Sequence, residues 1–250
     1  MLKEIRNLIA FLTAIPVGMD ENCLTDAANH MYLFPLVGAF IGFLAGVFGW
    51  LLLNILPSFV AGILTLGFIL LLTGLHHTDG LLDFGDGLMY QGPPEKKIEI
   101  MHDQQTGTGG LALGLVTILT TALSIAQLNR DLIIQSLIVS EVSAKHSMVL
   151  IAWAGRSARK GMNTYFVDAM HGQHRNIRMM VALFIAFSIA VALLRIIGFS
   201  ALITGLITSL IMVWASDRHF KGITGDVMGA ANELTRMFSL IVVLAAIRWA

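Results

Sequence analysis

The chain has 250 residues, of which 56% are hydrophobic and only 13% are charged. This apolar share exceeds that of ordinary soluble domains and predicts an all-α polytopic membrane protein. The 16 basic residues equal the 16 acidic ones, which gives no excess for binding nucleic acid, and the single cysteine, Cys23, excludes an intramolecular disulfide.

The first segment, residues 1–16, carries Lys3, Glu4 and Arg6 ahead of an apolar stretch. It lacks the small-residue cleavage site of a signal peptide. We therefore expect a helix that lies at the membrane interface.

Seven hydrophobic windows follow, each a candidate for a transmembrane helix. A helix needs roughly 20 apolar residues to cross a bilayer, because it must satisfy its own backbone hydrogen bonds there. The last two windows are short, so we expect about seven helices, with six to eight possible, in one domain over residues 1–250. The windows are 31–53, 57–75, 110–128, 132–154, 179–197, 201–215 and 237–250.

The distribution of lysine and arginine predicts the orientation. With the N-terminus inside, the outer loops 54–57, 129–131 and 198–200 contain one basic residue, Arg130. By the positive-inside rule the long loops then face the cytosol. We expect the protein to lie in the cytoplasmic membrane. The inner segments carry 12 of the 16 basic residues: Lys3, Arg6, Lys96, Lys97, Arg156, Arg159, Lys160, Arg175, Arg178, Arg218, Lys221 and Arg236.

The segment after the second window contains three aspartates. Asp79, Asp83 and Asp86 are spaced by four and three residues, which places them on one face of a helix. Like charges repel on such a face, so the pattern indicates a bound cation, and oxygen ligands favour Mg²⁺, Mn²⁺ or Ca²⁺. Because Mg²⁺ often binds carboxylates together with substrate phosphates, a diphosphate substrate is expected. The alternative is a solvated loop that turns at its glycines.

A second acidic set follows on a helix that Pro93 and Pro94 are expected to open. Glu95, Glu99 and Asp103 are spaced by four residues, and Asp103 is the best candidate for a second metal ligand. The alternative is that Glu95 and Glu99 are surface acids offset by Lys96 and Lys97.

Between this set and the third window lies a glycine-rich run, Thr106-Gly107-Thr108-Gly109-Gly110. The run stands at a helix start, whose free N–H groups can hold a phosphate. Thr106 and Gly107 are therefore candidate substrate contacts.

Basic residues fill the next inner segment, 156–178, which also contains His171 and His174. They can bind phosphates or the headgroups of anionic lipids. The lipid alternative is slightly favoured, because basic residues are common next to membrane helices on the inner face.

The last inner segment, 222–233, places Asp226 and Glu233 seven residues apart on one helical face, with Asn232 beside them. These residues are candidate metal and substrate ligands. The alternative is a helix capped by Thr224 or Asp226. In the fourth window, Glu141 and Lys145 form a pair at i and i+4 that can neutralise itself.

Three motifs stand in order along the chain. They are Phe11-Leu12-Thr13-Ala14-Ile15-Pro16-Val17 with Phe34-Pro35-Leu36-Val37-Gly38, then His77-Thr78-Asp79-Gly80-Leu81-Leu82-Asp83-Phe84-Gly85-Asp86-Gly87 with Glu99-Ile100-Met101-His102-Asp103 and Gly107, and finally Thr224-Gly225-Asp226 with Gly229-Ala230 and Asn232-Glu233-Leu234. These motifs resemble those of the cobalamin synthases, also called adenosylcobinamide-GDP ribazoletransferases, an integral membrane family. Two positions depart from the family pattern, because Ala14 replaces a common arginine and Arg236 a common glutamate.

The resemblance implies the reaction of adenosylcobinamide-GDP with α-ribazole, or its 5′-phosphate, to give adenosylcobalamin, or its 5′-phosphate, and GMP. We expect Asp79, Asp83 and Asp86 to hold Mg²⁺, and Asp103, together with Glu99 or Asp226, to position a second ion. His77 is the candidate base, although it can equally orient a carboxylate or cap the helix.

Three rival functions remain open. A CDP-alcohol phosphotransferase would show Ala-Arg where Asp83-Phe84 stands, and an aspartate-rich prenyltransferase would show an Asn-Asp-x-x-Asp motif. A cation transporter would carry its acids near the bilayer midplane. The sequence also leaves open a homo-oligomer or an association with other enzymes of cobalamin assembly.

Overall fold

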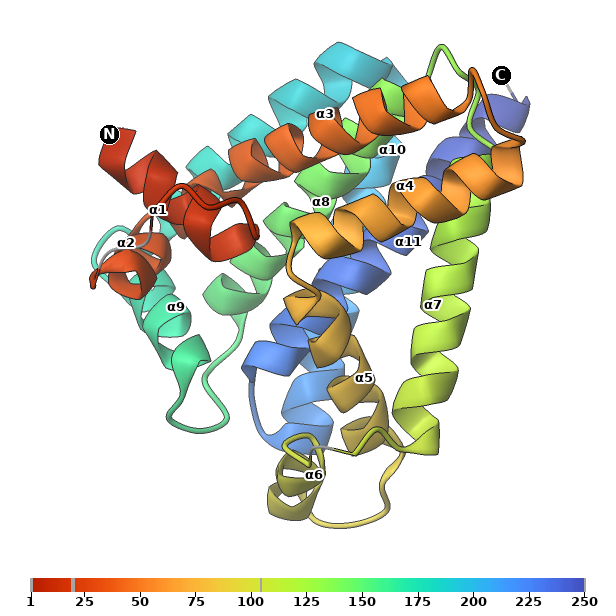
Figure 1. Ribbon diagram of the computed structural model, residues 1–250. Coiled ribbons are helices and arrows are strands. Elements are labelled where there is room, and N and C mark those ends of the chain that lie inside the picture. The colour runs from red at the N-terminus through yellow and green to blue at the C-terminus, as the bar shows by residue number, and fades with distance from the viewer. Residues whose placement is uncertain (1, 19–20, 104, 250) are drawn as a thin grey trace.

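The computed structural model describes residues 2–18, 21–103 and 105–249, and the described residues form helices with no strand (Figure 1). One isolated bridge joins Ser157 to Ile223. The predicted all-α class is therefore confirmed. The helices are α1 (Leu2–Leu12), α2 (Cys23–Asn29), the 3₁₀ turn η1 (Met31–Leu33), α3 (Phe34–Leu52), α4 (Ser58–Leu72), α5 (His76–Met89), α6 (Pro94–Ile100), α7 (Thr108–Ala126), α8 (Ile133–Ala154), α9 (Met162–His171), α10 (Arg175–Phe220) and α11 (Gly225–Trp249).

Among the described residues, five helical segments are long and apolar enough to cross a membrane: 31–52, α7, α8, α10 and 225–248. A sixth crossing is possible if α4 and α5 together form one broken span. These two helices meet at 95°, where Gly74 and Leu75 take the left-handed backbone conformation. The protein is thus a multi-pass membrane protein, while the number of crossings stays a prediction.

The fifth and sixth predicted windows both lie in α10, a helix of 46 residues that breaks at Arg195. The Phe187 and Phe199 rings lie 6.1 Å apart, so the helix folds back on itself at the break. The predicted connection at residues 198–200 is wrong, because these residues are helical. The lengths of the two apolar windows could not show that a single residue, Arg195, forms the turn between them.

The other end of α10 leads to a second difference from the prediction. Helix α11 begins at Gly225, earlier than the predicted last window, so Asp226, Asn232 and Glu233 lie on the last long helix, as expected from their helical spacing. Arg236, which we counted among the cytosolic basic residues, is fully buried in the same helix.

Helix α8 is the centre of the bundle, and most of its 22 residues are buried. It packs against α3, α10 and α11. Glycine makes the α3 contact possible, because a Cβ atom at Gly42 would lie 2.5 Å from the Leu137 carbonyl oxygen. Such close packing by small residues is typical of membrane helices.

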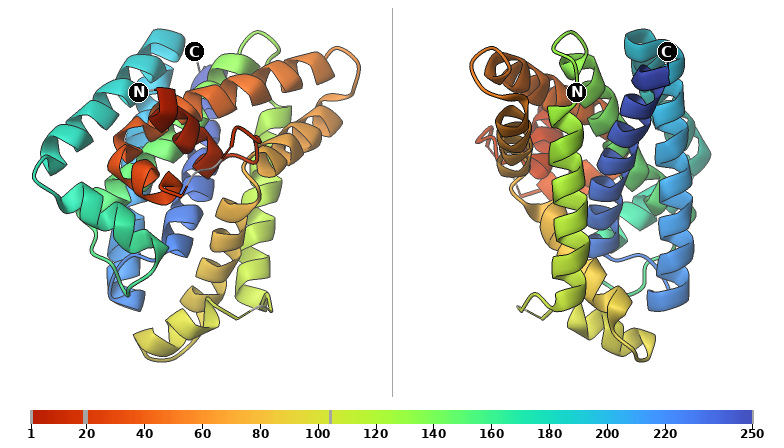
Figure 2. Two further views of the ribbon diagram at one scale, coloured as in Figure 1. Left: turned by 60° about the vertical axis from the view of Figure 1, so that its left-hand side comes forward. Right: turned by 90° about the vertical axis from the view of Figure 1, so that its right-hand side faces the viewer.

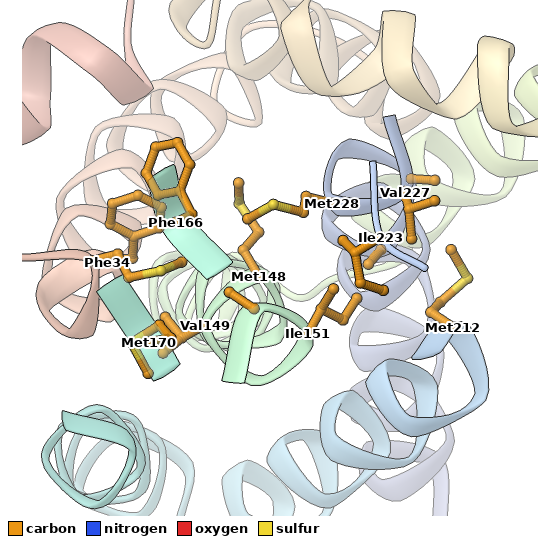
Figure 3. Close-up of a cluster of buried hydrophobic side chains, with 14 of the residues drawn as sticks. Phe34, Met148, Val149, Ile151, Phe166, Met170, Met212, Ile223, Val227 and Met228 are labelled. Carbon is orange, nitrogen blue, oxygen red and sulfur yellow. The ribbon is translucent and has the colours of Figure 1, made fainter. Parts of the chain in front are cut away.

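Apolar side chains from five helices meet near the C-terminal end of α8. Figure 3 shows Phe34 of α3, Met148 of α8, Phe166 of α9, Met212 of α10 and Met228 of α11 in this cluster. Beside it, α5 runs along the first half of α7 and along the start of α11 (Figures 1 and 2). The packing of this apolar cluster therefore holds in place the helix ends that lie around α5.

Candidate functional site

Helix α5 carries Asp79, Asp83 and Asp86, and its helical structure confirms that the three aspartates share a face. Glycines on the same helix allow neighbouring helices to approach. A Cβ atom at Gly80 would lie 2.9 Å from the Asp226 Cα atom of α11. The close approach brings a fourth carboxylate, from the first turn of α11, to the acidic helix.

We call Asp79, Asp83, Asp86 and Asp226 the carboxylate cluster. Asp83 lies within electrostatic range of the other three carboxylates, and of these three Asp226 acts most strongly on the Asp83 carboxylate. Among the described residues, none of the four forms an ion pair with a lysine or arginine. Their mutual repulsion is therefore left without a basic partner, which favours a cation.

Asp86 has a structural task within the cluster. Its Oδ2 atom accepts the Gly107 N–H at 2.7 Å, and its Oδ1 atom accepts the Gly110 N–H at 2.8 Å. A carboxylate at the start of a helix is stabilised by these unpaired donors and by the helix dipole. Two N–H groups that we expected to hold a phosphate are thus bound by Asp86, which anchors α7.

A cavity of about 370 Å³ adjoins this anchor. The predicted metal ligand Asp103 and the predicted substrate contacts Thr106 and Gly107 line it together with Asp86. The Asp103 Oδ1 atom accepts the Gln105 N–H at 3.2 Å. The structure therefore brings the glycine-rich run and Asp103 together, on the exposed side of Asp86.

Glu99 lies apart from this cavity. Its side chain is exposed and forms an ion pair with Lys96 at 2.5 Å, as the surface alternative predicted. The neighbouring Lys97 does not offset an acid. Its ammonium donates to the carbonyls of Gly87, Leu88 and Tyr90 at 3.2, 3.2 and 2.6 Å, which caps the end of α5, and burial lowers the pKa of Lys97.

His77, the predicted base, is buried at 7% exposure, and its Nδ1 atom has no hydrogen-bond partner among the described residues. It lies within electrostatic range of Lys145 and Arg236, which belong to the interior of the bundle. A different histidine, His102 in the α6–α7 connection, is exposed and lies within electrostatic range of the Asp226 carboxylate. Our sequence reasoning gave His102 no role, although it stands beside Asp103 in the second family motif.

Asn232 and Glu233, the other predicted substrate contacts, are buried in a network that also contains Glu141, Lys145 and Arg236. The Lys145 ammonium donates to Asn232 at 2.7 Å and pairs with Glu141 at 3.4 Å, which confirms the predicted pair. Arg236 bonds to both Glu141 and Glu233. We call these five residues the buried charge network. It contains two cations and two anions and does not line the cavity beside Asp86.

Oxygen donors make the carboxylate cluster suitable for Mg²⁺. Within residues 2–18, 21–103 and 105–249, no three His, Cys, Asp or Glu side chains already form a metal site. Mg²⁺ commonly binds one or two carboxylates and completes its shell with water and substrate phosphates. The residues present thus fit an ion that protein and substrate hold jointly.

Comparison with known proteins agrees with the motifs. Residues 4–244 match the family model described as cobalamin-5-phosphate synthase. The chain is 38% identical to an adenosylcobinamide-GDP ribazoletransferase of Methanocella arvoryzae, over all of this chain and 97% of the relative. It is 32% identical to the protein of that name in Thermococcus kodakarensis, over 98% of this chain and 99% of the relative. No solved structure matches. The chain belongs to the cobalamin-5-phosphate synthase family.

Proposed function

We propose that the protein catalyses the final assembly step of cobalamin. It joins adenosylcobinamide-GDP to α-ribazole, or to α-ribazole 5′-phosphate, and releases GMP. Relatives named adenosylcobinamide-GDP ribazoletransferase support the reaction. The structural observation that carries the proposal is the carboxylate cluster, whose acids form no ion pair with a lysine or arginine among the described residues and which reaches a cavity through Asp86. Such a site suits a diphosphate bound with a cation.

The reaction transfers the cobinamide phosphoryl group. A ribazole hydroxyl attacks the cobinamide-linked phosphorus, the bond from that phosphorus to the GMP oxygen breaks, and the hydroxyl proton is lost. One or two of Asp79, Asp83 and Asp226 would hold Mg²⁺ together with the substrate diphosphate, and Asp86 keeps the start of α7 in place. When bound, Mg²⁺ neutralises charge on the diphosphate and on the departing GMP.

Two histidines are candidates to accept the hydroxyl proton. His77 is buried on the inner side of α5, whereas His102 is exposed near Asp226. Neutral imidazole accepts a proton near physiological pH. Rates for His77→Gln and His102→Gln will identify the base, because GMP release falls steeply when the base is lost and stays near the wild-type rate when the other histidine is replaced.

We place the site on the cytosolic side of the cytoplasmic membrane. The support is the excess of lysine and arginine in the segments on that side. Cysteine accessibility tests this placement. A cysteine at exposed position 95 should react with a membrane-impermeant maleimide only in inverted vesicles, and one at position 130 only in right-side-out vesicles.

The test of function is GMP release from adenosylcobinamide-GDP by protein in nanodiscs. We expect release that requires α-ribazole and Mg²⁺, stops with EDTA, returns with added Mg²⁺ and is lost in Asp83→Ala. If folded wild-type protein releases no GMP, the ribazoletransferase proposal fails. Release that persists in EDTA or in Asp83→Ala would remove the metal role from the carboxylate cluster.

A further inference from the structure

A second cavity, of about 600 Å³, lies where the end of α8, the end of α9 and both ends of α10 meet. It shares no lining residue with the cavity beside Asp86. The connection between α10 and α11 forms part of its wall and leads directly to Asp226. We call it the arginine cavity. Its polar lining residues are Arg156, His171, Arg175, Asp217 and Arg218.

The charge of this cavity is unbalanced. Asp217 is its one acidic lining residue, and its Oδ1 atom bonds to the Arg156 guanidinium at 3.1 Å. Neither Arg175 nor Arg218 forms an ion pair within the described part of the chain. Two guanidinium groups therefore remain without an acidic partner.

Aromatic rings hold these two guanidinium groups. Arg175 lies over the Trp153 ring at 5.2 Å, and Arg218 lies over the Trp214 ring at 6.0 Å. Arg175 also donates to the Trp153 carbonyl at 3.1 Å, while its buried Nε has no hydrogen-bond partner among the described residues. A ring contact positions a guanidinium without occupying its N–H groups, so these donors stay available to an anion.

The remaining wall of the cavity is apolar and belongs to α10. Leu210 and Trp214 line the cavity and are 55% and 64% exposed. They continue an exposed apolar surface of the same helix that includes Ile207 and Ile211. In a helix that spans the membrane, such a surface faces lipid. The cavity thus combines free arginine donors with a hydrocarbon-facing wall.

We propose that the arginine cavity binds a phosphate ester. Guanidinium groups recognise phosphate through paired N–H donors, and two of them lie here at the membrane surface. The phosphate can come from the headgroup of an anionic phospholipid or from a soluble phosphate ester, and the apolar wall of α10 favours the phospholipid. This site is separate from the carboxylate cluster, so its test is independent of GMP release.

The experiment compares wild type, Arg175→Gln/Arg218→Gln and Arg130→Gln. Arg130 is a matched control, because its guanidinium also lies over a tryptophan ring, that of Trp50 at 4.9 Å, but Arg130 does not line the arginine cavity. Native mass spectrometry measures how much phosphatidylglycerol and phosphatidylcholine each protein retains from a 1:1 mixture. In parallel, inorganic phosphate is titrated against tryptophan fluorescence in phosphatidylcholine nanodiscs. Thermal unfolding shows that each variant is folded.

We expect wild type and Arg130→Gln to retain more phosphatidylglycerol than phosphatidylcholine. In the double variant the ratio of retained phosphatidylglycerol to phosphatidylcholine should fall about tenfold. Saturable binding of inorganic phosphate that only the double variant loses, without a lipid preference, would assign the cavity to a soluble phosphate ester. If the folded double variant behaves as the wild type does in both assays, or if wild type binds neither probe, the proposal is wrong.

Discussion

The carboxylate cluster and the buried charge network show two ways of keeping charges in one helical bundle. The network pairs every ion: Glu141, Glu233 and Arg236 are at most 3% exposed, and each charge meets its opposite. The cluster places four acids together, and no lysine or arginine in the described part of the chain forms an ion pair with them. A buried pair is costly to break, whereas an unbalanced site persists because a ligand completes it. The balance of charge is therefore the observation on which we propose a structural role for the network and a cation-binding role for the cluster.

Asp83→Asn should show the largest effect on activity. The change keeps the shape of the side chain but removes the charge that the cation needs, so we expect GMP release to fall about a thousandfold. The unfolding midpoint should stay or rise, because repulsion within the cluster decreases. Asp168→Asn, at an exposed position of α9, is the control. A rate near that of wild type would show that Asp83 holds no cation.

Arg236→Met should be the most destabilising change in the buried charge network. Removing the guanidinium leaves Glu233 buried without its ion-pair partner and leaves Glu141 with Lys145 alone, which costs about 3–5 kcal/mol in the free energy of unfolding. Chemical or thermal unfolding in detergent measures the loss. The exposed Arg248 lies on the same helix, so Arg248→Met should change little. Equal stability of the two variants would contradict the structural role of the network.

Asp86→Ala should give an intermediate effect, because Asp86 belongs to the cluster but also anchors α7. Loss of the two bonds to Gly107 and Gly110 should cost about 1–2 kcal/mol. Hydrogen exchange should increase first at residues 107–112. Asp86→Asn retains one acceptor oxygen and should lose less protection. Should exchange at these residues stay unchanged in Asp86→Ala, the anchoring role is refuted.

Glu99→Gln should have the smallest effect. Its partner Lys96 is exposed, and exposed ion pairs contribute little. GMP release and its dependence on Mg²⁺ concentration should stay within about twofold of wild type. A large increase in the Mg²⁺ concentration required would return Glu99 to the set of metal ligands.

The sequence by itself determined the features that depend on neighbours along a helix. Apolar windows predicted the membrane class, and spacings of three and four residues placed Asp79, Asp83 and Asp86 on one face. The same spacing predicted the pair of Glu141 with Lys145. These inferences succeeded because the period of the α-helix decides which nearby side chains meet.

Only the tertiary structure decided which helix each face would meet. Asp86 binds N–H groups 21 and 24 residues away, and Arg236 reaches Glu141 across 95 residues. The single-residue break at Arg195 and the gathering of Arg175 with Arg218 in one cavity likewise follow from how the helices pack. Helical periodicity contains no information about the partner of a face, because that depends on the close approach allowed at residues such as Gly42 and Gly80.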